Sequence, residues 1–242
     1  NFRSLTGILL GEEDTGEARI GYKGIGFKSI FRYTQEVYIR SGNFSFGFSK
    51  QRTGSKMPWE VIPIFESEIE KVEEIKNFEF FNTPVAFAFK FTNLELREQA
   101  IQYLEQLLAS PQTFLFLDNL TRLEVVVGDR VNTINREVIK CNSYSKINLQ
   151  LNEELPQVWL VCQETNTITD EMILKELKDE NNPSIPLKFR NFNTPQVQIA
   201  FPLVPGKELI NMYAYLPLSE TKSGLPYVLN GDFIPNLDRT DI

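Results

Sequence analysis

The segment IGYKGIGFKS, residues 20–29, gathers glycines and lysines in a way that decides how the first part of this chain is interpreted. The glycines are Gly21, Gly24 and Gly26, and the lysines are Lys23 and Lys28. Glycines permit backbone conformations that are closed to other residues. Successive amides in such a loop can turn inward around an anion, and a helix that begins just after it adds its positive N-terminal end. The segment therefore predicts a phosphate-binding turn. A glycine-rich turn that only leads into a helix is the alternative.

Two common phosphate loops do not fit this segment. A Walker-type loop needs Lys directly after its last Gly, whereas Phe27 follows Gly26 here. The dinucleotide pattern needs a third Gly where Ser29 stands, and it also needs a buried strand before the loop. A polar stretch over residues 1–21 precedes the segment instead. A phosphate site here must belong to another class.

Composition places the chain among globular proteins and excludes several classes of function. Its 242 residues are 42% hydrophobic and 24% charged, with 25 basic and 32 acidic side chains and a net charge of −7. This excludes disordered and fibrous proteins, and the acidic balance argues against sequence-independent DNA binding. No apolar run approaches the roughly 20 residues that span a bilayer. The chain has no His, which excludes Ser-His-Asp catalysis and His-ligated zinc.

The cysteines point to a compartment. Cys141 and Cys162 are far apart and form no CxxC pattern, so the sequence predicts a reducing, cytoplasmic environment without a disulfide framework. We expect both to be inert and buried on strands. The chain begins at Asn1 rather than at Met, and we expect it to be a piece of a longer protein.

Hydrophobic periodicity predicts the elements up to residue 110. They are a polar loop or lid over 1–21, a short helix just after it, a hairpin over 36–50 that turns at Ser41-Gly42-Asn43, a strand over 59–65, a solvated acidic helix or loop over 66–76, a strand over 84–92 and an amphipathic helix over 94–110. The helix carries an apolar stripe from Leu94 to Leu108 and ends before Pro111.

After Pro111 the pattern changes to closely spaced strands, and we place a domain boundary there, between 1–110 and 111–242. The expected strands are TFLFL (113–117), TRLEVVV (121–127), REVIKC (136–141), KINLQL (146–151), QVWLVC (157–162), 196–204 and 210–218. Gly128-Asp129 marks a hairpin turn. A second helix is predicted over 169–180, with Thr169 as its N-cap.

A longer pattern around the first segment resembles a known family. IGYKGIGFKSIF followed by EVYIRSGNFSFGF is similar to the glycine-rich lid motif of the GHKL (Bergerat-fold) ATPases, in the sacsin and NO VEIN branch near the ninety-kilodalton heat-shock chaperones. The match runs over residues 20–48. The resemblance implies that the segment from Gly21 to Lys28, with Lys23 in it, forms part of an ATP site and hinges a lid. It implies that the backbone at Gly24, Ile25, Gly26 and Phe27 contacts the phosphates.

Two further positions match the family. Asn82-Thr83 stands where the family has Gly-Thr on a strand, and the resemblance makes Thr83 a candidate that helps to hold the adenine. A Thr-Pro entry into a strand is the alternative. At the far end, YLPLSETKSGLPYVLNGDFIPNLDRTDI is similar to the family's arginine loop, with Arg239 at the place of its Arg. A planar, permanently charged guanidinium can neutralise charge on a transferred phosphoryl group, an effect of roughly 10³–10⁵ in rate elsewhere. A solvated surface residue is the alternative for Arg239.

The resemblance also implies a fold and a function. The fold would be α+β or α/β: the C-terminal half of a Bergerat-type sandwich over 1–110, then a strand-rich domain over 111–242 like the chaperones' middle domain. The cofactors would be ATP and Mg²⁺. The family's metal-holding Asn, water-activating Glu and adenine-recognising Asp all precede the lid motif. No metal ligand is therefore expected within this chain, and the fragment alone would be inactive.

The function implied is an ATP-driven conformational switch in a larger protein. Its partners would be ATP, other domains of the same polypeptide and, after ATP binding, a second copy. A membrane or nucleic-acid partner is not expected for this segment. A non-catalytic interaction scaffold that keeps the fold without ATP turnover is the alternative, because Asn82 departs from the family's pattern.

Overall fold

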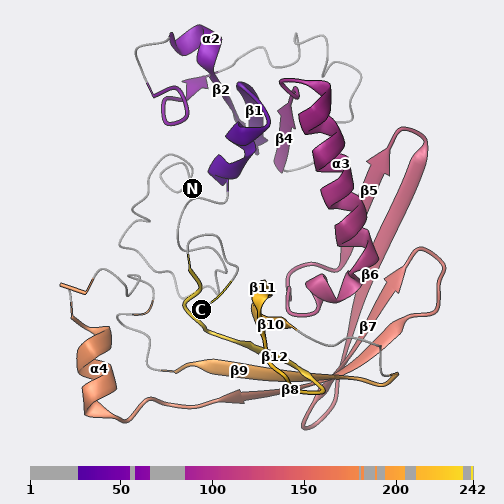
Figure 1. Ribbon diagram of the computed structural model, residues 1–242, viewed down its shortest axis with the longest axis vertical. Helices are drawn as coiled ribbons and strands as arrows, with labels where there is room; N and C mark the ends of the chain where they lie inside the picture. Colours follow the sequence, from indigo (N-terminus) through magenta and orange to yellow (C-terminus); the bar gives the residue numbers. More distant parts are fainter. Residues whose placement is uncertain are drawn as a thin grey trace. The chain divides into compact units, whose positions relative to one another are not determined.

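The structure is a computed structural model. In it the chain forms two compact units, residues 1–100 and 101–242. The structure describes residues 27–54, 58–65, 85–179, 181–182, 189, 194–204, 211–236 and 241. The division between the units falls inside helix α3, Leu94–Ala109, which is drawn in purple in Figure 1. The boundary expected from the sequence lies at the end of this helix, at Pro111.

The first unit contains a four-stranded antiparallel sheet in the order β3-β2-β1-β4. Its strands are β1 (Glu36–Ser41), β2 (Phe44–Ser49), β3 (Ile64–Phe65) and β4 (Val85–Phe89). The 3₁₀ helix η1, Phe27–Arg32, precedes β1, and the one-turn helix α2, Lys50–Thr53, follows β2. The predicted hairpin is confirmed, and its turn uses Gly42 at a φ of 56°, in the left-handed region.

Alternation along the hairpin builds the core of this unit. Val37 and Ile39 of β1 lie opposite Phe48 and Phe46 of β2, and all four side chains are buried. Trp59 completes this core. Because side chains on a strand alternate between faces, this spacing of two residues directs these four side chains to one face of the sheet.

The strand expected over 59–65 is shorter than predicted. Within 58–65, the described part of this stretch, Ile64 and Phe65 alone pair with β2, and a turn with a hydrogen bond from Val61 N to Pro58 O (3.0 Å) comes first. Pro63 has no N–H to donate to a ladder, which limits how early the strand can begin.

The second unit contains an eight-stranded sheet in the order β11-β10-β12-β9-β8-β7-β6-β5. Its strands are β5 (Arg122–Val127), β6 (Arg130–Lys140), β7 (Ser145–Leu151), β8 (Gln157–Thr165), β9 (Gln196–Pro202), β10 (Asn211–Ala214), β11 (Leu216–Lys222) and β12 (Val228–Gly231). The β10–β12 pair is parallel and the other pairs are antiparallel. The two sheets and their helices confirm the mixed α and β content that the sequence predicts.

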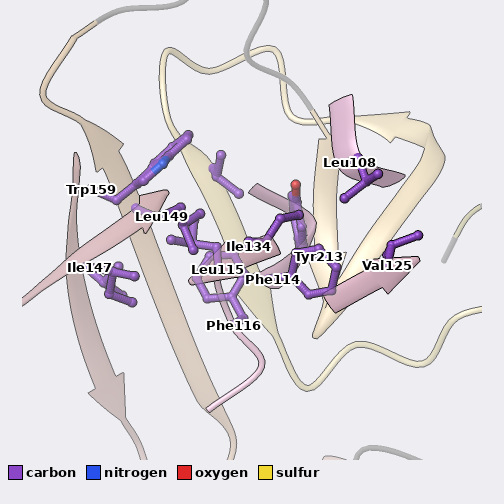
Figure 2. Packing of buried hydrophobic residues seen from close by; sticks show 13 residues of the cluster. Leu108, Phe114, Leu115, Phe116, Val125, Ile134, Ile147, Leu149, Trp159 and Tyr213 are labelled. Atoms are coloured by element: carbon purple, nitrogen blue, oxygen red, sulfur yellow. The ribbon is translucent and has the colours of Figure 1, made fainter. Parts of the chain in front are cut away.

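One core holds this unit together, as Figure 2 shows. Leu108 at the end of α3 contributes to it, together with residues of the turn after α3 and of seven strands. The strand residues are Val125, Ile134, Ile147, Leu149, Trp159, Val161, Ala200, Tyr213 and Val228. The other end of the predicted helical stripe behaves differently, because Leu94 is 74% exposed.

The strand predicted over 113–117 is wrong. The chain forms a 3₁₀ helix there, η4 (Pro111–Phe114), followed by a turn with bonds from Leu115 N to Gln112 O (3.0 Å) and Leu120 N to Leu117 O (3.0 Å). Phe114, Leu115 and Phe116 are all buried in the core. A strand would place consecutive side chains on opposite faces, whereas a tight helical turn buries all three.

The single strand predicted over 210–218 is also wrong. The chain reverses at Tyr215, which has a φ of 67°, so β10 and β11 pair with each other as antiparallel neighbours. The strand β12 follows in a stretch for which the sequence predicts no strand. Its central Asn230 is buried, and side-chain hydrogen bonds from this residue, described below, fix the reversal at Tyr215.

Two local predictions need correction as well. The helix α4 covers Glu171–Leu177, and its N-cap is Asp170 rather than Thr169, because the Asp170 carboxylate accepts from Met172 N (2.8 Å) and Ile173 N (3.2 Å). Cys141 and Cys162 are exposed rather than buried. Cys162 lies on β8 directly after Val161, the last buried residue of that strand, and Cys141 follows the end of β6.

Candidate functional site

Helix η1 carries the two predicted ligand residues that the structure describes, Phe27 and Lys28. The Phe27 ring lies 5.4 Å from that of Phe31, 5.6 Å from Phe48 and 5.9 Å from Phe87, measured between ring centroids. The side chain of Phe27 therefore packs against β2 and β4. What this residue can offer an anion is its backbone, which is the group that the resemblance assigns to the phosphates.

A second set of ring contacts fixes η1 to the sheet. Phe31, one helical turn after Phe27, has its ring centroid 5.7 Å from that of Phe48 and 4.9 Å from that of Trp59. Edge-to-face aromatic pairs add about 0.5–1.5 kcal/mol each beyond burial of their area. The end of the glycine-rich segment is thus anchored on the aromatic face of the sheet by contacts from three separate stretches of chain.

Hydrogen bonds fix the point where η1 passes into β1. Tyr33 N donates to Ile30 O (2.9 Å), and the Tyr33 carbonyl accepts from Thr92 N (2.9 Å) and from the Thr92 hydroxyl (3.2 Å). The buried Thr34 hydroxyl then bonds the backbone of Glu36 as both donor (2.7 Å) and acceptor (3.0 Å). The exit of η1 and the stretch after β4 are therefore joined.

A second polar site lies in the other unit, at the Asn230-Gly231-Asp232 triplet of the predicted arginine-loop region. Asn230 is 2% exposed; its Oδ1 accepts from Tyr215 N (2.7 Å), and its Nδ2 donates to Gln198 Oε1 (2.6 Å). Asp232 accepts from the Tyr215 hydroxyl (2.9 Å) and from Gln196 N (3.0 Å). This triplet binds the turn at Tyr215 to β9, so its side chains have a defined structural role.

The two tyrosines beside this triplet have perturbed acidities. Burial raises the pKa of Tyr213 to about 12. Burial, reinforced by the hydrogen bond and the negative charge of Asp232, raises the pKa of Tyr215 from its usual range. Both phenols therefore stay neutral across the physiological pH range and serve as hydrogen-bond or packing groups rather than as bases.

The remaining predicted site residues fall outside the described part of the chain. They are Gly21, Lys23, Gly24, Ile25, Gly26, Thr83 and Arg239. Phe27 and Lys28 are neighbours on η1 in the first unit, while Arg239 belongs to the second unit. The roles assigned to these residues remain predictions.

Sequence reasoning missed the buried polar residues. Arg136 on β6 is 5% exposed; its guanidinium donates to Leu115 O (3.3 and 3.1 Å) and to Asp118 Oδ1 (2.7 Å), which holds the turn after η4. A charged residue in an alternating strand gives no local sign that it points inward. The Asn230-Gly231-Asp232 triplet shows only a family resemblance in the sequence, and its partners Tyr215 and Gln198 are too distant in sequence to identify by spacing.

The described residues contain neither a metal-binding cluster nor a helix that could span a membrane. Within them, no group of three or more acidic or cysteine side chains lies close enough together to hold a metal ion. No helix in the same residues is long and apolar enough to cross a membrane.

Comparison with known proteins gives one similarity. No protein-family model matches the chain, and no solved structure matches it. The chain is 25% identical, over 263 aligned positions that include all of it, to Protein NO VEIN of Arabidopsis thaliana. It spans only 9% of the length of that protein. The chain is therefore similar, throughout its length, to a small part of a much larger plant protein.

Proposed function

We propose that this chain is part of an ATP-binding conformational switch of the GHKL type, in a NO VEIN-like protein. The observation that carries the proposal is the passage from the glycine-rich segment directly into η1, whose Phe27 and Phe31 rings pack on the β1–β2 hairpin. The similarity to Protein NO VEIN, which includes both this segment and the C-terminal part, supports it.

The physical reason is that a switch needs one fixed and one responsive part. Ligand binding shifts a conformational equilibrium only through different affinities for the two states. The ring contacts and the Tyr33–Thr92 bonds hold η1 and the strands as the fixed part. The glycine-rich residues would supply the responsive part, ordered by backbone N–H bonds to phosphate oxygens.

The rest of the site would come from elsewhere. Mg²⁺ and its Asn ligand, the water-activating Glu and the adenine-recognising Asp would be supplied by residues before the lid motif, and Arg239 would approach from the second unit. The partners proposed are ATP, other domains of the same polypeptide and a second copy after ATP binding. The proposed location is the reducing cytoplasm, since both cysteines are exposed and unpaired thiols.

The test of the proposal is nucleotide binding by the intact protein. Gly26→Val places a branched side chain where a phosphate would approach the backbone, and we expect it to abolish the heat of binding of a non-hydrolysable ATP analogue in calorimetry. Gly128→Asn is the control, because Gly128 lies in the turn between β5 and β6, where an added Cβ would meet no atom within 4 Å and Asn tolerates the positive φ; this variant should bind normally.

A second substitution tests turnover. We expect Arg239→Ala to reduce ATP hydrolysis by at least about tenfold with analogue binding retained, because a guanidinium that meets the transferred phosphoryl group acts mainly in the transition state. Undiminished turnover would remove Arg239 from the proposal. A folded protein that gives no heat with the analogue would instead support the non-catalytic scaffold.

A further inference from the structure

Strand β5 is the last strand at one end of the eight-stranded sheet (Figure 1). Among the described residues, no element other than β6 packs closely along it. The strand contains no Pro, and its register with β6 has no bulge. The opposite edge is different, because β11 contains Pro217 and the β10–β11 register shifts, two features that protect a sheet edge from a further strand. Within the described residues, β5 is therefore an open edge of this sheet.

The hydrogen bonds of β6 show which groups of β5 point to this open side. Arg136 N donates to Thr121 O (2.8 Å), and these two residues continue the β5–β6 register. The direction of the backbone groups alternates along an antiparallel ladder. The N–H and C=O groups of Arg122, Glu124 and Val126 therefore point away from β6. No hydrogen bond within the described residues occupies them.

The side chains of the same three residues form an exposed row along the edge. Those of Arg122 and Glu124 are 61% and 46% exposed and make an ion pair at 2.6 Å, and Val126 is 58% exposed. The residues between them, Leu123 and Val125, face the core. Opposite charges attract across strands and like charges repel. A strand added here should therefore place an acidic group opposite Arg122, a basic group opposite Glu124 and an apolar group opposite Val126.

The same stretch of a second copy has this pattern when it runs antiparallel to β5. Arg122 of each copy would stand opposite Glu124 of the other. Leu120 of the second copy would then stand opposite Val126, and Leu123 would face its own equivalent at a two-fold axis. The neighbouring register would place two Glu124 side chains opposite each other, which their like charges disfavour. The edge and the sequence that complements it are thus present in one strand.

We propose that β5 pairs with β5 of a second copy about a two-fold axis at Leu123, so that the eight-stranded sheets of two copies join. Such an interface uses the same surface on both copies. The contacts between Arg122 and Glu124 set the register, and the backbone groups of these residues exchange hydrogen bonds. The contact is short, which places it among weak, transient interfaces. The pairing needs no nucleotide and uses no residue of the proposed ATP site, so it is tested separately from the function proposed above.

A disulfide at the two-fold axis tests the pairing directly. Facing residues of a non-hydrogen-bonded antiparallel pair have Cα atoms about 4.5 Å apart, within the range of roughly 4.4–6.8 Å that a disulfide spans. We use the intact protein with both exposed cysteines, Cys141 and Cys162, replaced by Ser. On mild oxidation without nucleotide, Leu123→Cys should join two copies through position 123.

Val131→Cys is the matched control for this cross-link. Val131 is exposed on β6 of the same hairpin, and it lies away from the open side of β5. Mass spectrometry should find peptides joined through position 123 at least about tenfold more often than through position 131, because pairing raises the effective concentration of the facing thiols.

An exchange of charges tests the register. Arg122→Glu places like charges opposite each other at both contacts, and so does Glu124→Arg. We expect each variant alone to raise the dissociation constant about tenfold or more in analytical ultracentrifugation without nucleotide. An equimolar mixture of the two variants should associate again, although the ion pair within each strand stays broken. Arg130→Glu is the control, since it makes the same charge change on β6 and should leave association unchanged.

The outcomes decide the pairing without reference to ATP. A yield at position 123 no greater than at position 131 would overturn it. So would a mixture that associates as weakly as its two components. Gly26→Val should cross-link at position 123 as the protein with native Gly26 does, whether or not it binds the ATP analogue. Failure of the ATP proposal would therefore leave the β5 pairing standing, and failure of the pairing would leave analogue binding unchanged.

Discussion

Tyr213 and Tyr215 are separated by one residue, and different contacts fix their side chains. Tyr213 is 4% exposed in the core of the second unit, where its ring centroid lies 5.2 Å from that of Phe116. Tyr215 adopts a φ of 67° at the reversal between β10 and β11, and its hydroxyl bonds Asp232. At both positions burial is the largest cause of the raised pKa. Ionisation of either phenol therefore lowers the free energy of unfolding.

This gives a prediction at high pH. The pKa of Tyr213 is raised to about 12 in the folded protein, against about 10 in an unfolded chain. The stability that comes from its neutral form is complete below pH ~10 and is lost as the pH rises from about 10 to 12. Tyr213→Phe keeps the ring and removes this loss, which is on the order of 2 kcal/mol in the free energy of unfolding.

Urea unfolding of both forms, below pH ~10 and again at pH ~12, measures the difference. The difference in the free energy of unfolding between the unaltered protein and the Tyr213→Phe variant should become smaller or change sign as the pH rises. Because the pKa of Tyr215 is also raised, part of the decline should remain in the variant. A gap that does not change with pH would show that Tyr213 ionises as freely in the folded protein as in the unfolded one.

The hairpin of β1 and β2 is the element on which η1 packs. At Gly47 the two strands leave no room for a Cβ atom. A Cβ at this position would lie 2.8 Å from the Val37 carbonyl oxygen, which is backbone and cannot move aside, and 3.4 Å from the Tyr38 ring. Gly47 stands within the SGNFSFGF stretch that resembles the ATPase family. Close approach of two strands explains why glycine suits this position.

Gly47→Ala should therefore separate β1 from β2 and lower the free energy of unfolding of the first unit by about 1–3 kcal/mol, the usual cost of overpacking. Thermal unfolding followed by circular dichroism measures it. Ser45→Ala on the same strand is the control, because Ser45 lies opposite Arg40 with no glycine contact to disturb. Equal melting temperatures for the two variants would show that the strands can move apart at little cost.

Elements with strong periodicity could be predicted from the sequence, and those set by distant side chains could not. The hairpin around Gly42 and the helix α3 follow from alternation and from apolar spacing. The turn after η4 depends on Arg136, which bonds Leu115 O from a strand 21 positions away. The reversal at Tyr215 depends on Asn230 in the same manner. Local patterns contain no information about such partners.

The candidate site shows the same limit. The sequence predicts a short helix after the glycine-rich loop, and the 3₁₀ helix η1 covers Phe27–Arg32. It does not indicate that the Phe27 ring packs on Phe48 and Phe87, since those contacts need the β1–β2 and β1–β4 pairings first. Near the C-terminus, the resemblance indicates Arg239, which lies outside the described residues, whereas the hydrogen bond between Asn236 and Asp241 is known from the structure alone.

At the scale of the whole molecule, the described residues form two hydrophobic cores, one in each unit. Val37, Ile39, Phe46, Phe48 and Trp59 form one of them, and the core of the second unit includes Trp159. The chain has two tryptophans, so each core contains one. Domains with their own cores can unfold in separate steps, which makes the two indoles independent reporters of the two units.

We expect the units to respond separately to damage in one of them. In a Trp159→Phe background, tryptophan fluorescence reports on Trp59 and the first unit, and Gly47→Ala should lower the urea midpoint of that signal. In a Trp59→Phe background, the fluorescence reports on Trp159 and the second unit, and Gly47→Ala should leave the midpoint almost unchanged. Because the division falls inside α3, loss of the first unit can fray the start of that helix. Leu108, which packs in the second core, lies in its last turn. Equal shifts of both midpoints would mean that the helix couples the two cores into one cooperative unit.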